Sequence, residues 1–122
     1  MKENTLEDRL VDFSADIVRF ARFLNKKDHV KPIVDQIIRS SYSVALNYGE
    51  AQSAESRKDF IHKMRISLKE LRETKVAMKI IGKTIDKLDN DQLQTLMKEV
   101  KELISIFIAS INTATTNLQN QK

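Results

Sequence analysis

Four stretches of the chain carry apolar residues at alternating intervals of three and four, the spacing that keeps side chains on one face of an α-helix. The pattern predicts helices over residues 5–25, 32–53, 56–87 and 90–118. In chain order, the predicted core positions are Leu6, Leu10, Phe13, Ile17, Phe20 and Leu24; Ile33, Ile37, Ser40 or Ser41, Val44, Tyr48 and Ala51; Phe60, Met64, Ser67, Leu71, Thr74, Met78, Ile81 and Ile85; and Leu93, Leu96, Val100, Leu103, Phe107, Ile111, Ala114 and Leu118.

The starts of the predicted helices carry residues that usually cap helices. Thr5 precedes the first helix with Asp8 three residues on, and Ser56 opens the third helix in a similar way. Pro32 fits the first turn of the second helix, where its missing N–H has no intrahelical partner to lose. Short connections join the four helices, so we predict an all-α fold, an up-down-up-down antiparallel four-helix bundle in one domain over residues 1–122.

Composition narrows the class of protein further. The 122 residues include no cysteine, which excludes disulfides, thiol catalysis and cysteine-based zinc sites. Two glycines and one proline are too few turn residues for a β-rich fold. No apolar run reaches the roughly 18 residues of a membrane span, and the start MKENTLEDRL does not resemble a signal peptide. We therefore expect a soluble, cytoplasmic protein without a membrane partner.

A polar stripe runs along the second predicted helix beside its apolar face. Its members follow steps of four and three and are Gln36, Ser40, Ser43, Asn47 and Glu50. Serines permit close approach of two backbones, and buried polar groups usually hydrogen-bond one another. We interpret the stripe as a seam between helices or subunits, and a ligand or partner site is the alternative.

The third predicted helix carries a basic face nearly opposite its core positions. Its members are Lys58, His62, Arg65, Lys69, Arg72, Lys79, Lys83 and Lys87. The chain has a net charge of +4, whereas residues 57–87 alone hold ten Lys or Arg against four Asp or Glu, a net charge of +6. Such a concentration of positive charge suits a phosphate backbone.

A solvated surface is the alternative interpretation of this basic face, with Glu70 and Glu73 pairing locally with the cations. Base stacking is not predicted, because Phe60 is the single aromatic residue of the helix and the pattern assigns it to the core. Charge alone therefore leaves two hypotheses, a nucleic-acid surface and a plain solvated face.

Signals for metal binding or catalysis are weak. Asp59 and His62 lie one helical turn apart, as two ligands would, but a di-metal bundle needs that motif twice with further inward carboxylates. No Ser-His-acid order and no glycine-rich phosphate loop occurs. We predict a protein that is not an enzyme and has no metal, no cofactor and no small-molecule substrate.

Some apolar residues fall outside the four core faces. They are Val11, Val18, Ile61, Leu68, Ile104 and Ile108. A second apolar face is better buried in an assembly than in a monomer, so we expect the bundle to pack against copies of itself.

Residues 36–78 carry a pattern that reads Q-x-x-R-S-x-x-S-x-x-x-N-x-x-E-A, then S-x-x-D-F-I-x-K, then K-E-x-x-E-T. The matching residues are Gln36, Arg39, Ser40, Ser43, Asn47, Glu50 and Ala51; Ser56, Asp59, Phe60, Ile61 and Lys63; and Lys69, Glu70, Glu73 and Thr74. This pattern resembles the bacterial four helix bundle protein family, also called the S23 ribosomal protein family. Its members include proteins encoded in intervening sequences of large-subunit ribosomal RNA genes. Many members have an aromatic pair where this chain has Val76 and Ala77.

The resemblance implies a bundle that often forms a homopentamer, and a distant relative is a basic pentamer that engages a reverse transcriptase and nucleic acid. It implies no catalytic residue. It also implies that the polar stripe is a seam between the second and third helices, with the members Gln36, Arg39, Ser40, Ser43, Asn47, Glu50, Glu70 and Glu73.

The resulting hypothesis is an oligomeric interaction protein that contacts RNA or DNA through its third helix. The residues expected to make that contact are Lys58, Arg65, Lys69, Arg72, Lys79 and Lys83. A protein–protein scaffold without nucleic-acid binding is the alternative.

Overall fold

The computed structural model describes residues 5–25, 31–84 and 90–121. Within these residues the chain forms the helices α1 (Leu6–Asn25), α2 (Lys31–Gln52), α3 (Arg57–Thr84) and α4 (Asn90–Asn120), and no strand. The four predicted helices are confirmed, to within two residues at every end that is described. The predicted last turn of the third helix, residues 85–87, lies outside the described residues, as does the predicted core position Ile85.

Hydrogen bonds at two helix starts explain why the helices begin where they do. The Asp8 backbone N–H donates to the Thr5 hydroxyl at 3.1 Å, and the Thr5 N–H donates back to the Asp8 carboxylate at 3.4 Å. At the start of α3, the Asp59 N–H donates to the Ser56 hydroxyl at 3.0 Å. Each contact satisfies a backbone donor that the helix itself leaves without a partner.

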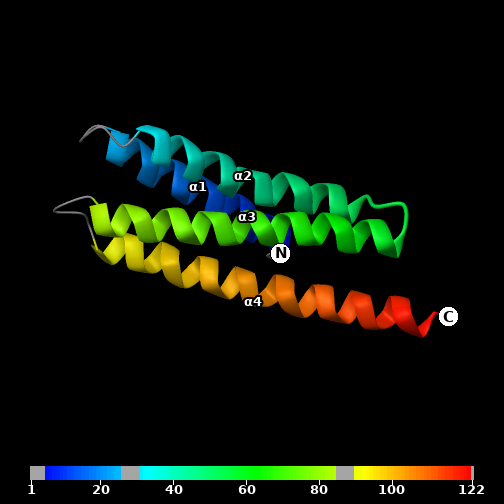
Figure 1. Cartoon of the computed structure of the whole chain (residues 1–122). Coiled ribbons are helices and arrows are strands. Elements are labelled where there is room, and N and C mark those ends of the chain that lie inside the picture. Colours follow the sequence, from blue (N-terminus) through cyan, green and yellow to red (C-terminus); the bar gives the residue numbers. More distant parts are fainter. Residues whose placement is uncertain (1–4, 26–30, 85–89, 122) are drawn as a thin grey trace.

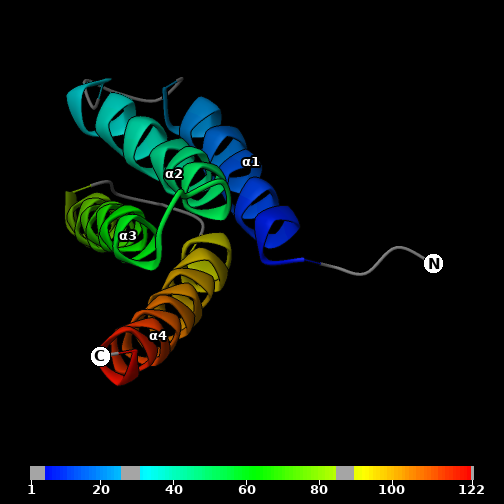
Figure 2. The ribbon, with the colours of Figure 1, turned by 90° about the vertical axis from the view of Figure 1, so that its right-hand side faces the viewer.

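Successive helices run antiparallel and pack side by side, α1 on α2, α2 on α3 and α3 on α4, as Figures 1 and 2 show. The first and last helices contact each other only narrowly. That narrow contact is strengthened by Arg9 of α1, which forms ion pairs with Glu99 at 2.7 Å and Glu102 at 2.6 Å. The hydrogen bond to Glu99 is the largest of the effects that raise the pKa of the Arg9 guanidinium. The predicted antiparallel four-helix bundle is confirmed.

The four helices differ in length, and this difference shapes one end of the molecule. α1 has 20 residues and α4 has 31, so α4 is longer by about 16 Å at 1.5 Å per residue. Glu7 in the first turn of α1 lies near Tyr48 of α2. Burial, and then the negative charge of Glu7, raise the pKa of the Tyr48 phenol. Beyond the level of Tyr48, α2, α3 and α4 continue without α1 (Figure 1).

Apolar side chains from all four helices meet in one core, with Phe13, Phe20 and Phe107 among its largest buried members. Most predicted core positions are buried, but two assignments are wrong by one residue. Val34 is buried where Ile33 was expected, and Ile61 is 5% exposed while Phe60 is only partly buried. Phe60 borders an open hollow between α2, the start of α3 and the end of α4, to which α1 contributes no residue.

Candidate nucleic-acid interface

The basic face of α3, defined as Lys58, Arg65, Lys69, Arg72, Lys79 and Lys83, is exposed along its whole length. α2 and α4 pack against the other sides of α3. None of the six side chains forms an ion pair with another described residue. From the first member to the last, the helix rises about 38 Å. The surface is therefore a long row of uncompensated positive charges.

The two glutamates nearest to this row turn toward α2 instead. Arg39 donates one hydrogen bond to Glu70 and one to Glu73, each at 3.0 Å. Desolvation lowers the pKa of the Arg39 guanidinium, but the charges and hydrogen bonds of the two carboxylates outweigh it and leave the pKa raised. Both carboxylates pair with Arg39, and neither forms an ion pair with Lys69 or Arg72. The alternative predicted from the sequence, in which Glu70 and Glu73 form ion pairs with cations of the basic face, is not what the structure shows.

Hydroxyl groups form the buried part of the contact between α2 and α3. The Ser40 and Thr74 hydroxyl oxygens lie 2.7 Å apart with both residues fully buried. Ser67 donates to the Val44 carbonyl at 3.1 Å. The sequence pattern places Ser67 and Thr74 at core positions. A polar residue at a core position indicates a hydrogen-bond partner on the facing helix, and both residues have one on α2.

The other members of the predicted seam make different contacts. Glu50 accepts from Lys63 of α3 at 3.0 Å. Asn47, by contrast, donates to the Ser43 carbonyl within α2 at 2.9 Å, so this pair makes no hydrogen bond to α3. Gln36 is exposed at the edge of a surface groove. Arg39, Ser40, Glu50, Glu70 and Glu73 thus make side-chain contacts between α2 and α3, whereas Ser43 and Asn47 are partly buried and bond within α2.

A groove of about 690 Å³ lies between the N-terminal half of α2 and the C-terminal half of α3. Apolar side chains form its floor, with Val76 and Ile80 55% and 44% exposed. Arg65, Lys69 and Arg72 of the basic face also line it. Exposed apolar patches on soluble domains often mark interaction sites. The middle of the basic face therefore borders a surface suited to another protein chain.

The other apolar positions outside the core faces differ in exposure. Val11 is 52% exposed and Ile108 37% exposed, whereas Ile61 is buried. Val18, Leu68 and Ile104 are partly buried within the single chain. Leu46 of α2, which the pattern did not single out, is 62% exposed. The exposed apolar side chains are therefore spread over several helices.

A smaller cavity of about 290 Å³ lies between α3 and the end of α4. Lys58, His62 and Arg65 line it from α3, and Thr115 lines it from α4. The Thr115 hydroxyl oxygen is buried and has no hydrogen-bond partner in the described part of the chain. Thr95 on the same helix, in contrast, donates to the carbonyl four residues before it. Ile61 and Leu118 complete the lining, whose accessible surface is mainly apolar, so the cavity offers few polar groups to a ligand.

Neither a metal centre nor a membrane span is found in the residues described. No three His, Asp or Glu side chains there are grouped so as to hold a metal ion, so Asp59 and His62 have no further ligand beside them. No helix in those ranges is both long enough and apolar enough to cross a bilayer.

Four antiparallel helices with one shared core and a polar α2–α3 contact define the protein as a four-helix bundle. The family model described as 23S rRNA-intervening sequence protein matches residues 2–109, and the chain belongs to this family. The resemblance seen in the sequence is thereby confirmed.

A solved structure agrees with this assignment. It is a protein of unknown function from the S23 ribosomal protein family of Bacteroides thetaiotaomicron VPI-5482. The two chains share 31% sequence identity with a TM-score of 0.79, over 88% of this chain and 98% of the other. No match to this chain is found among the curated proteins.

Proposed function

We propose that this protein is a non-enzymatic, self-associating module of the cytoplasm that binds RNA or DNA through the basic face of α3. One observation carries the proposal: the six cations of this face are exposed and unpaired, while Arg39 holds the neighbouring glutamates. The name of the family refers to intervening sequences of 23S rRNA, which favours RNA as the first nucleic acid to test.

Phosphate contacts release bound counterions, so this mode of binding has a characteristic dependence on salt. If all six cations contact phosphates, the logarithm of the affinity falls against the logarithm of salt concentration with a slope of about −5.

The test is fluorescence anisotropy of a labelled, structured RNA between about 50 and 200 mM salt. The variant Lys58→Glu, Lys69→Glu, Lys83→Glu reverses three charges along the basic face and is expected to lose most of the affinity and flatten the salt slope. The control variant Arg22→Glu, Lys98→Glu, Lys101→Glu changes net charge equally through exposed cations on α1 and α4. Equal loss in both variants contradicts a defined binding face.

A protein–protein scaffold is the second candidate. The groove in which the apolar side chains of Val76 and Ile80 are exposed favours it. Self-association through such a surface, with a homopentamer as the assembly we favour, is compatible with either function. The two candidates differ in one result: the scaffold predicts no RNA binding at low salt and no effect of charge reversal. Unaltered anisotropy at every protein concentration would therefore favour the scaffold.

A further inference from the structure

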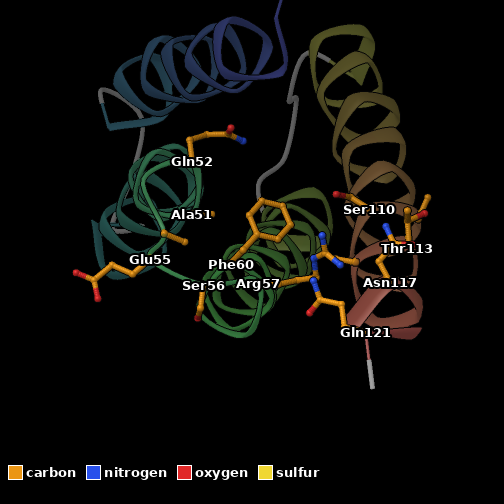
Figure 3. A pocket seen from close by; sticks show the side chains of 13 residues that line it. Ala51, Gln52, Glu55, Ser56, Arg57, Phe60, Ser110, Thr113, Asn117 and Gln121 are labelled. Atoms are coloured by element: carbon orange, nitrogen blue, oxygen red, sulfur yellow. The ribbon is translucent and has the colours of Figure 1, made fainter. Parts of the chain in front are cut away.

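The end of the bundle that α1 does not reach holds a cavity of about 810 Å³ (Figure 3). Its walls are the connection between α2 and α3, the first turn of α3 and the last turns of α4. Sites for small ligands and cofactors span roughly 300 to 1,000 Å³. This end pocket therefore has the size of a ligand site, and no residue of α1 lines it.

One wall of the end pocket is aromatic. The ring of Phe60, which the sequence pattern assigned to the core, is only partly buried and points into the space between α2 and α4 (Figure 3). A ring face that is open to a pocket is a platform on which a flat base can stack. The aromatic group that the basic face lacks is thus present at the same end of α3 as the first member of that face, Lys58.

Arg57 supplies a positive charge beside that ring. Its guanidinium reaches toward α4, near Asn117 and Gln121 (Figure 3). It forms no ion pair with any residue that the structure describes. Glu55 is the carboxylate among the lining residues, and its side chain points away from the pocket in the same view. An anion in the pocket would therefore meet a free cation.

The wall formed by α4 is polar in a way that suits the edge of a base. Ser110, Thr113 and Asn117 line it beside Ala109 and Ala114, and none of the three polar side chains hydrogen-bonds to a described residue. Ser105, one turn earlier on the helix, uses its hydroxyl on the Lys101 carbonyl. An amide has both a donor and an acceptor, and unpaired bases are commonly read by such groups after stacking on an aromatic ring.

We infer that the end pocket holds one unpaired nucleotide, with its base stacked on Phe60, its edge at Asn117 and its phosphate at Arg57. The inference rests on the proposed function and makes it more specific. Lys58, the residue after Arg57, projects about 100° further around α3, so a strand that leaves the pocket passes around the start of the helix to reach the basic face. The protein then binds a single strand, or a duplex with an unpaired end, more tightly than a continuous duplex.

The experiment compares a fluorescein-labelled, 12-nucleotide RNA with the same strand annealed to its complement, and repeats both with DNA. Phe60→Leu keeps an apolar side chain and removes the ring, so single-strand affinity is expected to fall roughly tenfold while duplex affinity stays unchanged. Arg57→Gln is expected to weaken single-strand binding as well. Phe23→Leu and Arg22→Gln on α1 are matched controls and leave both affinities unchanged.

A melting curve checks that each variant is folded, and Phe60→Tyr, which keeps the ring, is expected to bind like the original protein. If Phe60→Leu is unstable, Asn117→Ala at an exposed position carries the test with the same expected loss.

Loss of single-strand and duplex binding together, or of neither, overturns the inference but leaves the proposed function standing. A changed subunit number with unchanged RNA affinity assigns the pocket to self-contact and also overturns it. If the original protein binds neither probe, the proposed function fails as well.

Discussion

Glu70 is 7% exposed and lies on the α2 side of α3, where Arg39 meets it at 3.0 Å. Arg39 itself is about half exposed, so this pair lies between a surface ion pair and a buried one. A buried carboxylate that loses its partner keeps its desolvation cost, whereas a pair that is removed together leaves no charge behind. At this scale, the stability of the α2–α3 contact depends on keeping both partners.

Replacement of Arg39 by Leu tests this dependence. We expect Arg39→Leu to lower the free energy of unfolding by about 1 to 3 kcal/mol, because Glu70 stays buried without its donor. The double variant Arg39→Leu, Glu70→Leu is expected to recover part of that loss. Urea denaturation of the single and double variants measures both effects, with Arg22→Leu as an exposed control. A double variant that is less stable than Arg39→Leu contradicts the argument.

At the scale of single helices, the two glycines of the chain lie in different surroundings. A Cβ on Gly49 of α2 would meet nothing within 4 Å. A Cβ on Gly82 of α3 would lie 3.0 Å from the Leu93 Cδ2 atom of α4. Glycine inside a helix costs backbone entropy relative to alanine, so each position loses helix stability. Only at Gly82 does close packing between helices oppose a larger residue.

Alanine at each glycine separates helix propensity from packing. Gly49→Ala is expected to raise the free energy of unfolding by about 0.5 to 1 kcal/mol. Gly82→Ala is expected to gain less, because the Leu93 side chain must shift to admit the methyl group. Thermal and urea unfolding measure the difference. If Gly82→Ala stabilises the protein as much as Gly49→Ala does, the contact with Leu93 does not restrict this position.

At the scale of the whole molecule, the groove between α2 and α3 and the end pocket lie at opposite ends of α3. The groove is lined by Val76 and Ile80 near the end of the helix, and the pocket by Arg57 and Phe60 at its start. The basic face borders the groove through Arg65, Lys69 and Arg72, and its first member, Lys58, lies at the pocket end of α3. A copy that docks in the groove would therefore leave Lys58 and the end pocket open to a nucleic acid.

Self-association is tested through the groove. We expect Val76→Ser with Ile80→Ser to lower the mass measured by light scattering, because both side chains are exposed in the single chain and pack only in an assembly. The control Val11→Ser with Ile108→Ser changes the same two residue types at exposed positions of α1 and α4. A lower mass from the control pair alone would place the contact on α1 and α4 instead.

Some features of this molecule follow from residues near one another in the chain. Steps of three and four define the helix faces, and Thr5 and Ser56 mark two helix starts, because a helix and its cap depend on neighbours within about four residues. The charge of the basic face is likewise a local property of α3. These features were predictable without any knowledge of packing.

Other features depend on which segments meet and how far each helix extends. Phe60 and Ile61 are adjacent apolar residues, and only the packing of α2 and α4 around the start of α3 decides that the first borders a pocket and the second is buried. From the sequence, Glu70 and Glu73 are free to pair either with a cation of α2 or with one of the basic face, and the packing of α2 on α3 brings Arg39 to both. Helix periodicity determines which residues share a face, whereas the relative lengths and positions of the helices determine what that face meets.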